Sequence, residues 1–301
     1  MPLGYDRTIY IMAFDHRGSF QKLFGVTGPP TAEDTARIAD GKLLIFEGLQ
    51  QAIADGAAVE TAGVLTDEQY GADVARKAKA DGFPFAMPVE KTGQDEFDFE
   101  YGDAFGDHIE EFDPTFAKVL VRSNPEWDPE MNQRQFARLK RLGDWLADHG
   151  RRFLFELLVP ATPAQLAAVG GDANRYDTEV RPGLMLRIIE EIQEAGIDPD
   201  VWKIEGLESR ETCGQVSELV RRDGRDTVGC VVLGRGADDA KVETWLRAGA
   251  GVPGYLGFAI GRSIFNESVK GVASGTMDRS AGAALIARKY RHFVDVYEGR
   301  A

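Results

Sequence analysis

Short apolar runs alternate with longer segments of helical periodicity along the whole chain. The runs predict eight buried strands, at residues 8–14, 57–65, 83–89, 117–122, 153–159, 200–205, 228–233 and 255–260. Apolar residues at helical spacing are clearest at 133–149, 182–195, 212–222 and 239–249. Repeated strand–helix units are typical of a parallel sheet. Eight such units in 301 residues, with no linker, predict one domain over residues 1–301 that folds as a closed (β/α)8 TIM barrel.

An open doubly wound sheet is the alternative for the same order of elements. In that fold a glycine-rich turn usually follows the first strand. Here the first strand leads into Asp15-His16-Arg17-Gly18-Ser19-Phe20, which lacks such a turn, so the barrel is favoured. The segment 92–115 is rich in Asp, Glu and Gly, and we expect an exposed insertion there, with a lid as the alternative.

Charged residues occur inside several of these apolar runs. Side chains alternate along a strand, so Lys203 and Glu205 in the run 201–205 point to the same face. Burial of an ammonium or a carboxylate is costly unless the charge is paired. Further charges are Asp15 after the first strand, Lys91 after the third, Lys118 and Arg122 in the fourth, and Glu156 in the fifth. Catalytic groups of a TIM barrel lie at the carboxyl ends of its strands, so we expect these side chains to share one pocket.

Two lysines among carboxylates suit formation of an imine between a lysine and a ketone. An amine attacks a carbonyl only when it is unprotonated, and a neighbouring cation with partial desolvation favours that form. We expect Lys118 to be this cation for Lys203, and the carboxylates to carry protons during dehydration and C–C cleavage. Structural roles remain the alternatives: an ion pair of Lys203 with Glu205, a pairing of Glu156 with a lysine, and capping of a turn by Asp15.

Glycine-containing turns follow the last two strands. They are Leu233-Gly234-Arg235-Gly236-Ala237-Asp238 and Gly257-Phe258-Ala259-Ile260-Gly261-Arg262-Ser263. Loops in these positions of a TIM barrel commonly bind phosphate, because glycines let backbone N–H groups approach the anion. The arginines can add charge-assisted contacts. The candidate phosphate ligands are therefore Gly234, Arg235, Gly236, Gly261 and Arg262, with plain turns as the alternative.

Composition narrows the classes of partner. The formal charge of −14 disfavours nonspecific attraction to nucleic acid or to an anionic membrane. The chain shows no basic and apolar leader and no apolar run of membrane-spanning length, so a cytoplasmic location is expected. Cys213 and Cys230 lack metal-ligand spacing and are expected to pack in the interior. No histidine falls on strands two to eight, so we expect neither a catalytic metal nor another cofactor.

Several segments resemble, in order and spacing, the class I aldolases of the tagatose-bisphosphate aldolase type. They are Ala13-Phe14-Asp15-His16-Arg17-Gly18-Ser19, Lys118-Val119-Leu120-Val121-Arg122, Phe155-Glu156, Trp202-Lys203-Ile204-Glu205 and Gly261-Arg262-Ser263. The resemblance is closer to the aldolase-like domain that is fused behind a kinase in some bacterial inositol-catabolic proteins. That domain is assigned to cleavage of 2-deoxy-5-keto-gluconate 6-phosphate. The resemblance covers nearly the whole chain, and the lysine on the sixth strand is its most specific element.

The resemblance implies a role for each matching residue. Lys203 would form the imine, Lys118 would hold the cleaved hydroxyl region, Glu156 would be the acid and base, and Asp15 would contact the substrate. Arg262 and the turn 234–236 would bind the phosphate. The products would be dihydroxyacetone phosphate and malonate semialdehyde, whose carboxylate needs a cation such as Arg122 or Lys91. Further candidates for substrate contacts are His16, which replaces the glutamine of tagatose-type enzymes, and Glu205.

Other functions fit the same residues. Tagatose 1,6-bisphosphate and sulfofructose 1-phosphate are alternative aldolase substrates. A metal-dependent sugar-phosphate isomerase or epimerase would use Asp15, Glu60, Glu90, Glu156 and Glu205 as ligands or bases. A noncatalytic sensor would bind a sugar phosphate without turnover. In each case the expected partner is a small sugar phosphate. Assembly into a homo-oligomer is left open by the sequence.

Overall fold

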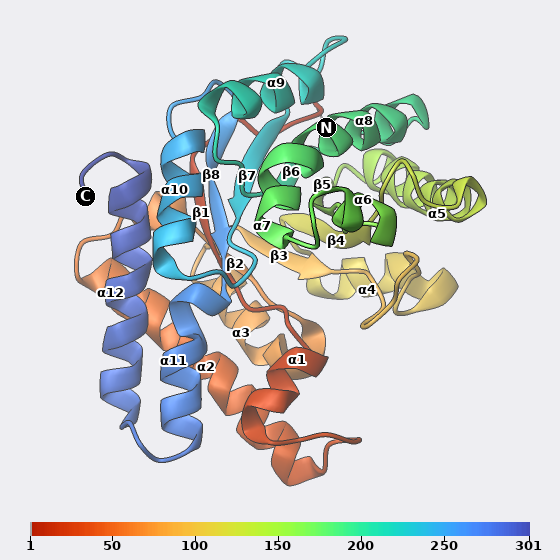
Figure 1. Ribbon diagram of the computed structural model, residues 1–301. Helices are drawn as coiled ribbons and strands as arrows, with labels where there is room; N and C mark the ends of the chain where they lie inside the picture. Colours follow the sequence, from red (N-terminus) through yellow and green to blue (C-terminus); the bar gives the residue numbers. More distant parts are fainter. Residues whose placement is uncertain (1) are drawn as a thin grey trace.

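The computed structural model describes residues 2–301 and contains a closed barrel of eight parallel strands (Figure 1). The strands are β1 (Ile9–Ala13), β2 (Ala62–Leu65), β3 (Phe85–Pro88), β4 (Phe116–Arg122), β5 (Arg152–Leu158), β6 (Val201–Glu205), β7 (Gly229–Leu233) and β8 (Tyr255–Ile260). Neighbours in the sequence are neighbours in the barrel, and β8 pairs with β1 to close it. The predicted (β/α)8 barrel is confirmed.

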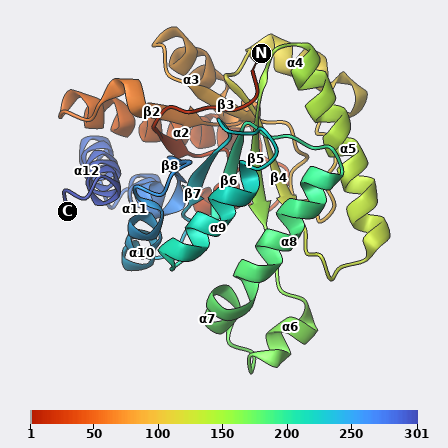
Figure 2. The same cartoon turned by 90° about the horizontal axis from the view of Figure 1, so that it is seen from above.

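Helices surround the barrel (Figure 2). They are α1 (Gly18–Gln21), α2 (Ala32–Ala54), α3 (Glu68–Ala80), α4 (Phe105–Phe112), α5 (Pro129–Asp148), α6 (Pro163–Ala168), α7 (Ala173–Arg175), α8 (Arg181–Glu194), α9 (Arg210–Val220), α10 (Asp239–Gly249), α11 (Arg262–Ala273) and α12 (Arg279–Tyr297). Short 3-10 turns are η1 (Lys22–Phe24), η2 (Val59–Thr61) and η3 (Gly102–Ala104), and η4 (Tyr176–Val180) is a π-helix. The helices predicted at 133–149, 182–195, 212–222 and 239–249 correspond to α5, α8, α9 and α10. No helix in residues 2–301 is long and apolar enough to cross a membrane.

The long helix α2 has a weak apolar pattern because small residues form part of its packed face. A Cβ atom at Gly48 would lie 2.4 Å from a side-chain carbon of Ile286 in α12, so the two helices approach each other closely. Thr31 and Asp34 form a capping box at the start of α2, which satisfies backbone N–H groups there. Local capping and close packing therefore define a helix that apolar spacing alone does not indicate.

The segment 92–115 is only partly the exposed insertion that its acidic composition suggests. Phe97 and Phe99 are buried, and a bridge joins Glu90 to Phe99 in antiparallel fashion. Phe105 and Ile109 bury one side of α4, which is the helix between β3 and β4. Buried aromatic residues thus anchor the segment, and the loop 91–96 that precedes them lies at the carboxyl ends of the strands.

The interior of the barrel has an apolar floor below a charged layer. Phe116, Leu154 and Val201 are buried in the inner cluster, together with residues such as Ile11, Leu65, Val231 and Ala259. Lys118, Glu156 and Lys203 come two residues later on the same strands, so they face the same interior nearer the carboxyl ends. The register places Glu156 opposite Lys203 on adjacent strands. Strand alternation therefore positions these charges beside one another.

Candidate active site

One large pocket, of about 900 Å³, opens at the carboxyl ends of the strands. Its lining includes every residue predicted for the aldolase site: Asp15, His16, Lys91, Lys118, Arg122, Glu156, Lys203, Glu205, Gly234, Arg235, Gly236, Gly261 and Arg262. Glu60, which was considered only for a metal-dependent enzyme, is exposed in η2 and is not part of this lining. The pattern of charges along the strands therefore located a real cavity. The role of each residue stays a prediction.

Lys118 is surrounded by carboxylates. Its Nζ atom lies 2.7 Å from Asp15 Oδ2, 2.6 Å from Glu90 Oε1 and 3.1 Å from Glu156 Oε2. The contacts with Asp15 and Glu90 are hydrogen bonds, and the contact with Glu156 is an ion pair. Lys118 is buried. It is thus a buried cation in contact with three carboxyl groups.

Lys203 is much less engaged. Its Nζ atom donates to Glu156 Oε2 at 2.9 Å, and this is its one hydrogen-bond partner within residues 2–301. The side chain is 3% exposed and lines the pocket. The alternative considered for Lys203, an ion pair with Glu205, is not formed within these residues, because Glu205 contacts other partners. The other two N–H donors of Lys203 therefore have no hydrogen-bond partner within residues 2–301.

The two lysines control the protonation of their carboxylates. Burial raises the pKa of Asp15, but Lys118 and Lys203 outweigh it and hold that pKa well below its usual value. The pKa of Glu156 is lowered in the same way, since the two lysines outweigh its burial. Burial lowers the pKa of Lys118, but Asp15, Glu156 and Glu90 raise it above its ordinary value. Asp15 and Glu156 are therefore anions at neutral pH, and Lys118 is a cation.

Glu90 is a site residue that sequence reasoning weighed only as a metal ligand. It follows β3, is buried, and its Oε2 atom has no hydrogen-bond partner within residues 2–301. Burial raises the pKa of Glu90, and the nearby Asp15 anion raises it further, while Lys118 acts in the opposite direction. Its position in the sequence could have indicated a site residue, because it follows Pro88, the last residue of β3, by two positions and so lies at the carboxyl end of that strand. It is the least stabilised anion of the cluster.

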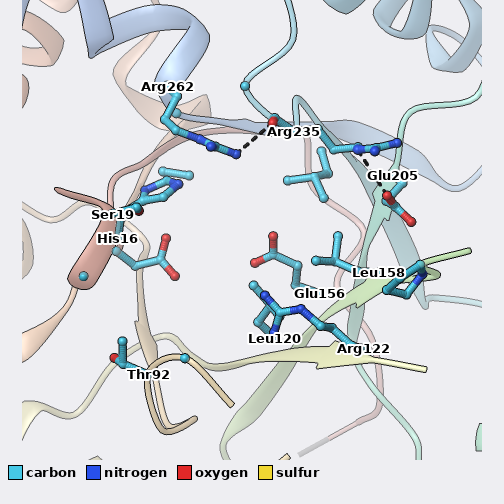
Figure 3. A pocket seen from close by; sticks show the side chains of 18 of the residues that line it. His16, Ser19, Thr92, Leu120, Arg122, Glu156, Leu158, Glu205, Arg235 and Arg262 are labelled. Atoms are coloured by element: carbon cyan, nitrogen blue, oxygen red, sulfur yellow. Dashed lines mark hydrogen bonds and ion pairs between the residues drawn. The ribbon is translucent and has the colours of Figure 1, made fainter. Parts of the chain in front are cut away.

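Glu205 and Arg235 contact each other instead of facing free space. Arg235 Nε lies 3.3 Å from Glu205 Oε1 (Figure 3). Arg235 Nη1 also donates to Asp177 Oδ2 at 2.8 Å. Glu205 Oε2 accepts from the backbone N–H of Val159 at 2.8 Å. The backbone of Arg235 has φ +51°, in the left-handed region that non-glycine residues rarely adopt. This network ties the loops after β5, β6 and β7 together. It also occupies the Arg235 side chain, which was expected to bind phosphate.

Arg262 begins α11 beside the turn 234–236. Its Nη2 atom donates to the carbonyl of Arg235 at 2.7 Å, and the residue lines the pocket. The N-cap residue of α11 is Gly261, whose missing side chain leaves the first N–H groups of the helix uncapped. A Cβ atom at Gly261 would lie 2.0 Å from the carbonyl oxygen of Ala13, so glycine is required by space. A cation and free backbone donors thus meet at one end of the pocket.

A second cation lies across the pocket. Figure 3 shows Arg122 and Arg262 on opposite sides of the Glu156 carboxylate, which points into the cavity. Arg122 donates to the carbonyl of Gln94 at 2.9 Å, which holds the guanidinium against the loop 91–96. Lys91 belongs to the same loop and also lines the pocket. The cavity therefore has a basic group at each end and the lysine pair between them.

His16 sits between Asp15 and Arg262 in this arrangement. Burial is the main cause that lowers the pKa of His16 to about 4. The Asp15 anion raises this pKa, and the cations Arg262, Lys42 and Lys203 lower it further. The imidazole is therefore neutral at physiological pH and can donate or accept a hydrogen bond. Across residues 2–301, no group of three or more His, Cys, Asp or Glu side chains is placed to hold a metal ion.

Comparisons with known proteins place the chain in a sequence family and support its fold. The family model described as "Uncharacterized protein conserved in bacteria (DUF2090)" matches residues 5–301. A solved structure of Cgl0159 from Corynebacterium glutamicum (Brevibacterium flavum) is similar, with a TM-score of 0.58 and 17% sequence identity. The similarity covers 96% of this chain and 88% of that chain, and at this identity it concerns the fold alone. A search of curated proteins finds no significant match.

Proposed function

This chain belongs to the DUF2090 family of bacterial proteins, and for it we propose the activity of a class I aldolase that cleaves a phosphorylated keto sugar through an imine on Lys203. The fold is one that commonly carries enzymes, with the site at the carboxyl ends of the strands. The finer assignment depends on the pocket residues. It does not follow from the fold, which hosts many unrelated chemistries.

The observation that carries the proposal is the unequal engagement of the three buried lysines. Lys42 donates hydrogen bonds to three protein oxygens. Lys118 donates to two carboxylates and forms an ion pair with a third. Lys203 has one partner in the described part of the chain, and it lines the pocket. An amine must lose a proton and approach a carbonyl before it can form a carbinolamine. Of the three, only Lys203 is placed to do so.

Glu156 is the group that would move protons in this reaction. Its Oε2 atom bonds to Lys203, and its carboxylate points into the cavity (Figure 3). The Lys203 amine adds to the ketone, and loss of water gives an iminium ion. Glu156 then takes the proton of the hydroxyl on the β carbon, which is the carbon of the scissile bond farther from the iminium. The C–C bond breaks, its electron pair moves into the iminium, and an aldehyde leaves. Protonation of the resulting enamine and hydrolysis release dihydroxyacetone phosphate and regenerate Lys203.

The basic groups at the two ends of the pocket support an assignment of the substrate's orientation. The phosphate would bind at Arg262 and the start of α11, which line the same pocket as Lys203. The far end of the substrate would then face Arg122 and Lys91. An anionic far end fits 2-deoxy-5-keto-gluconate 6-phosphate, which we propose as the substrate. A second phosphate, as in tagatose 1,6-bisphosphate, would meet the same cations.

The reaction can be tested in the synthetic direction. Purified protein is incubated with dihydroxyacetone phosphate and, in separate reactions, malonate semialdehyde, glyceraldehyde 3-phosphate and sulfolactaldehyde, and products are identified by mass spectrometry. We expect an aldol adduct with malonate semialdehyde that forms equally well in the presence of a chelator. An adduct with a different aldehyde would instead assign the sugar phosphate that yields that aldehyde as the substrate. Loss of all activity on chelation would favour a metal-dependent enzyme. Absence of any adduct would favour a noncatalytic sugar-phosphate sensor.

A further inference from the structure

Lys42 is a buried lysine outside the pocket that contacts the chain on both sides of Asp15. It lies in α2 and is 0% exposed. Its Nζ atom donates to the carbonyl of Phe14 at 2.6 Å and to the carbonyl of His16 at 2.9 Å, and it forms an ion pair with the Asp67 carboxylate. The ring of Phe20 lies 5.0 Å from the same atom. The ammonium group is therefore fully enclosed and fully engaged.

The backbone at Asp15 needs such a support because the sheet no longer holds it. β1 ends at Ala13, and the N–H of Phe14 makes the final bond to the neighbouring strand, to Leu65 O at 2.8 Å. Beyond that point, Lys42 binds the carbonyls of the residues before and after Asp15. With both carbonyls turned toward α2, the Asp15 carboxylate lies on the pocket side, 2.7 Å from Lys118 Nζ.

Asp67 completes the support from the next loop. Its Oδ1 atom accepts from the N–H of Tyr70 and thereby caps α3. Its Oδ2 atom pairs with Lys42. A single ammonium group thus joins α2, the loop after β1 and the start of α3. Burial of this ion pair costs desolvation, and a well-packed apolar pair is often at least as stable. Stability alone therefore does not explain a charge in this position.

We propose that Lys42 is a positioning residue, which aims Asp15 and His16 into the pocket by holding the two carbonyls that flank Asp15. This inference rests on the proposed aldolase function for its link to activity. Its structural content, the aim of the Asp15 carboxylate at Lys118, is independent of which reaction the pocket performs.

The test removes both charges together, because Lys42→Met alone would leave a buried unpaired carboxylate. In the pair Lys42→Met/Asp67→Asn, asparagine can still cap α3. The matched control is Lys77→Met/Asp81→Asn, which makes the same change in an exposed ion pair of α3. The readouts are borohydride trapping of dihydroxyacetone phosphate on Lys203, exchange of its α hydrogens in deuterium oxide, and a crystal structure of the variant.

We expect the control pair to behave as the wild type. In the double variant Lys42→Met/Asp67→Asn, dihydroxyacetone phosphate should still be trapped on Lys203. Exchange of its α hydrogens should be slower by at least about tenfold, since a misplacement of a catalytic group by about 1 Å can cost a factor of about 100. In an Asp15→Asn background the same pair should add little further loss, because both changes act through one carboxylate. The crystal structure should show the Asp15 carboxylate displaced from Lys118.

Three results would overturn the proposal: hydrogen exchange equal to the control, an equal further loss in the Asp15→Asn background, or an Asp15 carboxylate still bonded to Lys118. If the Met variant fails to fold, Lys42→Gln/Asp67→Asn decides instead. Its shorter side chain cannot reach both carbonyls, so exchange at the wild-type rate would refute the role. A wild type that is never trapped at Lys203 would refute the aldolase function, and the crystal structure would still decide the role of Lys42.

Discussion

The variant Glu156→Gln tests the centre of the site, because it removes one charge from between two buried ammonium groups without changing the shape of the side chain. Glu156 Oε2 lies 2.9 Å from Lys203 Nζ and 3.1 Å from Lys118 Nζ. The lysines hold the pKa of Glu156 below its usual value, so the folded protein favours the anion. Glutamine cannot supply that charge. It can still offer one oxygen to one lysine.

The size of the effect follows from these contacts. Hydrogen bonds to charged groups contribute about 1.5–3 kcal/mol each, and removal of one partner of a buried pair costs about 3–5 kcal/mol. Lys118 retains Asp15 and Glu90, so the loss falls mainly on Lys203. We expect the free energy of unfolding to drop by about 2–3 kcal/mol. C–C cleavage should fall by a factor of at least about 100, because the general base is gone.

Glu90→Gln is the matched control for this variant. It neutralises a second carboxylate of Lys118 but leaves the contact of Lys203 unchanged. Burial already raises the pKa of Glu90, so a neutral side chain there replaces a poorly stabilised anion. We expect its effect on the free energy of unfolding to stay within about 1 kcal/mol. Urea unfolding gives the stabilities, and synthesis of the aldol adduct gives the activity.

Borohydride trapping separates the two roles of Glu156. Imine formation needs the Lys203 amine and the ketone, whereas C–C cleavage also needs the Glu156 base, so trapping of dihydroxyacetone phosphate should persist in Glu156→Gln while cleavage is lost. The reasoning is refuted if Glu156→Gln cleaves substrate at the wild-type rate. It is equally refuted if Glu90→Gln reproduces both the instability and the loss of cleavage, because the contact with Lys203 would then be irrelevant.

Three further changes probe other parts of the site. Arg262→Ala should raise KM for a phosphorylated substrate by a factor of about 10–100 with a smaller change in kcat, since a charge-assisted bond contributes about 1.5–3 kcal/mol; an unchanged KM in steady-state kinetics would place the phosphate elsewhere. The folded-state pKa of His16 is about 4 against an ordinary 6.5, so the unfolded chain binds an extra proton between these values and stability falls as pH falls through that window. Urea unfolding should show a slope from this residue of up to about 1.4 kcal/mol per pH unit that His16→Gln removes, and an identical pH profile would count against it. Gly261→Ala should lower the free energy of unfolding by about 1–3 kcal/mol, because its Cβ would lie 2.0 Å from the Ala13 carbonyl oxygen. The control Gly143→Ala, whose Cβ would make an ordinary contact of 3.8 Å with Phe153, should not be destabilised, and equal losses would contradict this reading.

Strand alternation made the barrel and its charged layer predictable. Lys118, Glu156 and Lys203 follow inner apolar residues at a spacing of two, and this periodicity is a local property of the sequence. The parallel register then brings them together without further information. The turns after β7 and β8 were recognisable from their glycines, and Gly234, Gly236, Gly261 and Arg262 do line the pocket.

Contacts that depend on loops or on distant helices were not predictable in this way. Arg235 meets Asp177 from the π-helix η4, and Lys42 reaches the loop after β1 from α2, with no sequence periodicity linking either pair. The acidic composition of 92–115 concealed Phe97, Phe99 and Phe105, whose burial gives that segment its place. The sequence shows that these residues are charged, but the partner of each depends on how distant elements pack in three dimensions.

The most direct test of the account is the covalent attachment of substrate to one lysine. The protein is treated with dihydroxyacetone phosphate and borohydride, digested, and mapped by tandem mass spectrometry, with Lys203→Ala and Lys118→Ala examined in parallel and their folding checked by circular dichroism. The account predicts a single reduced adduct on Lys203 in the wild type, and no adduct in Lys203→Ala. An adduct on Lys118 or Lys42, or none in a wild type that still synthesises the aldol product, would contradict it.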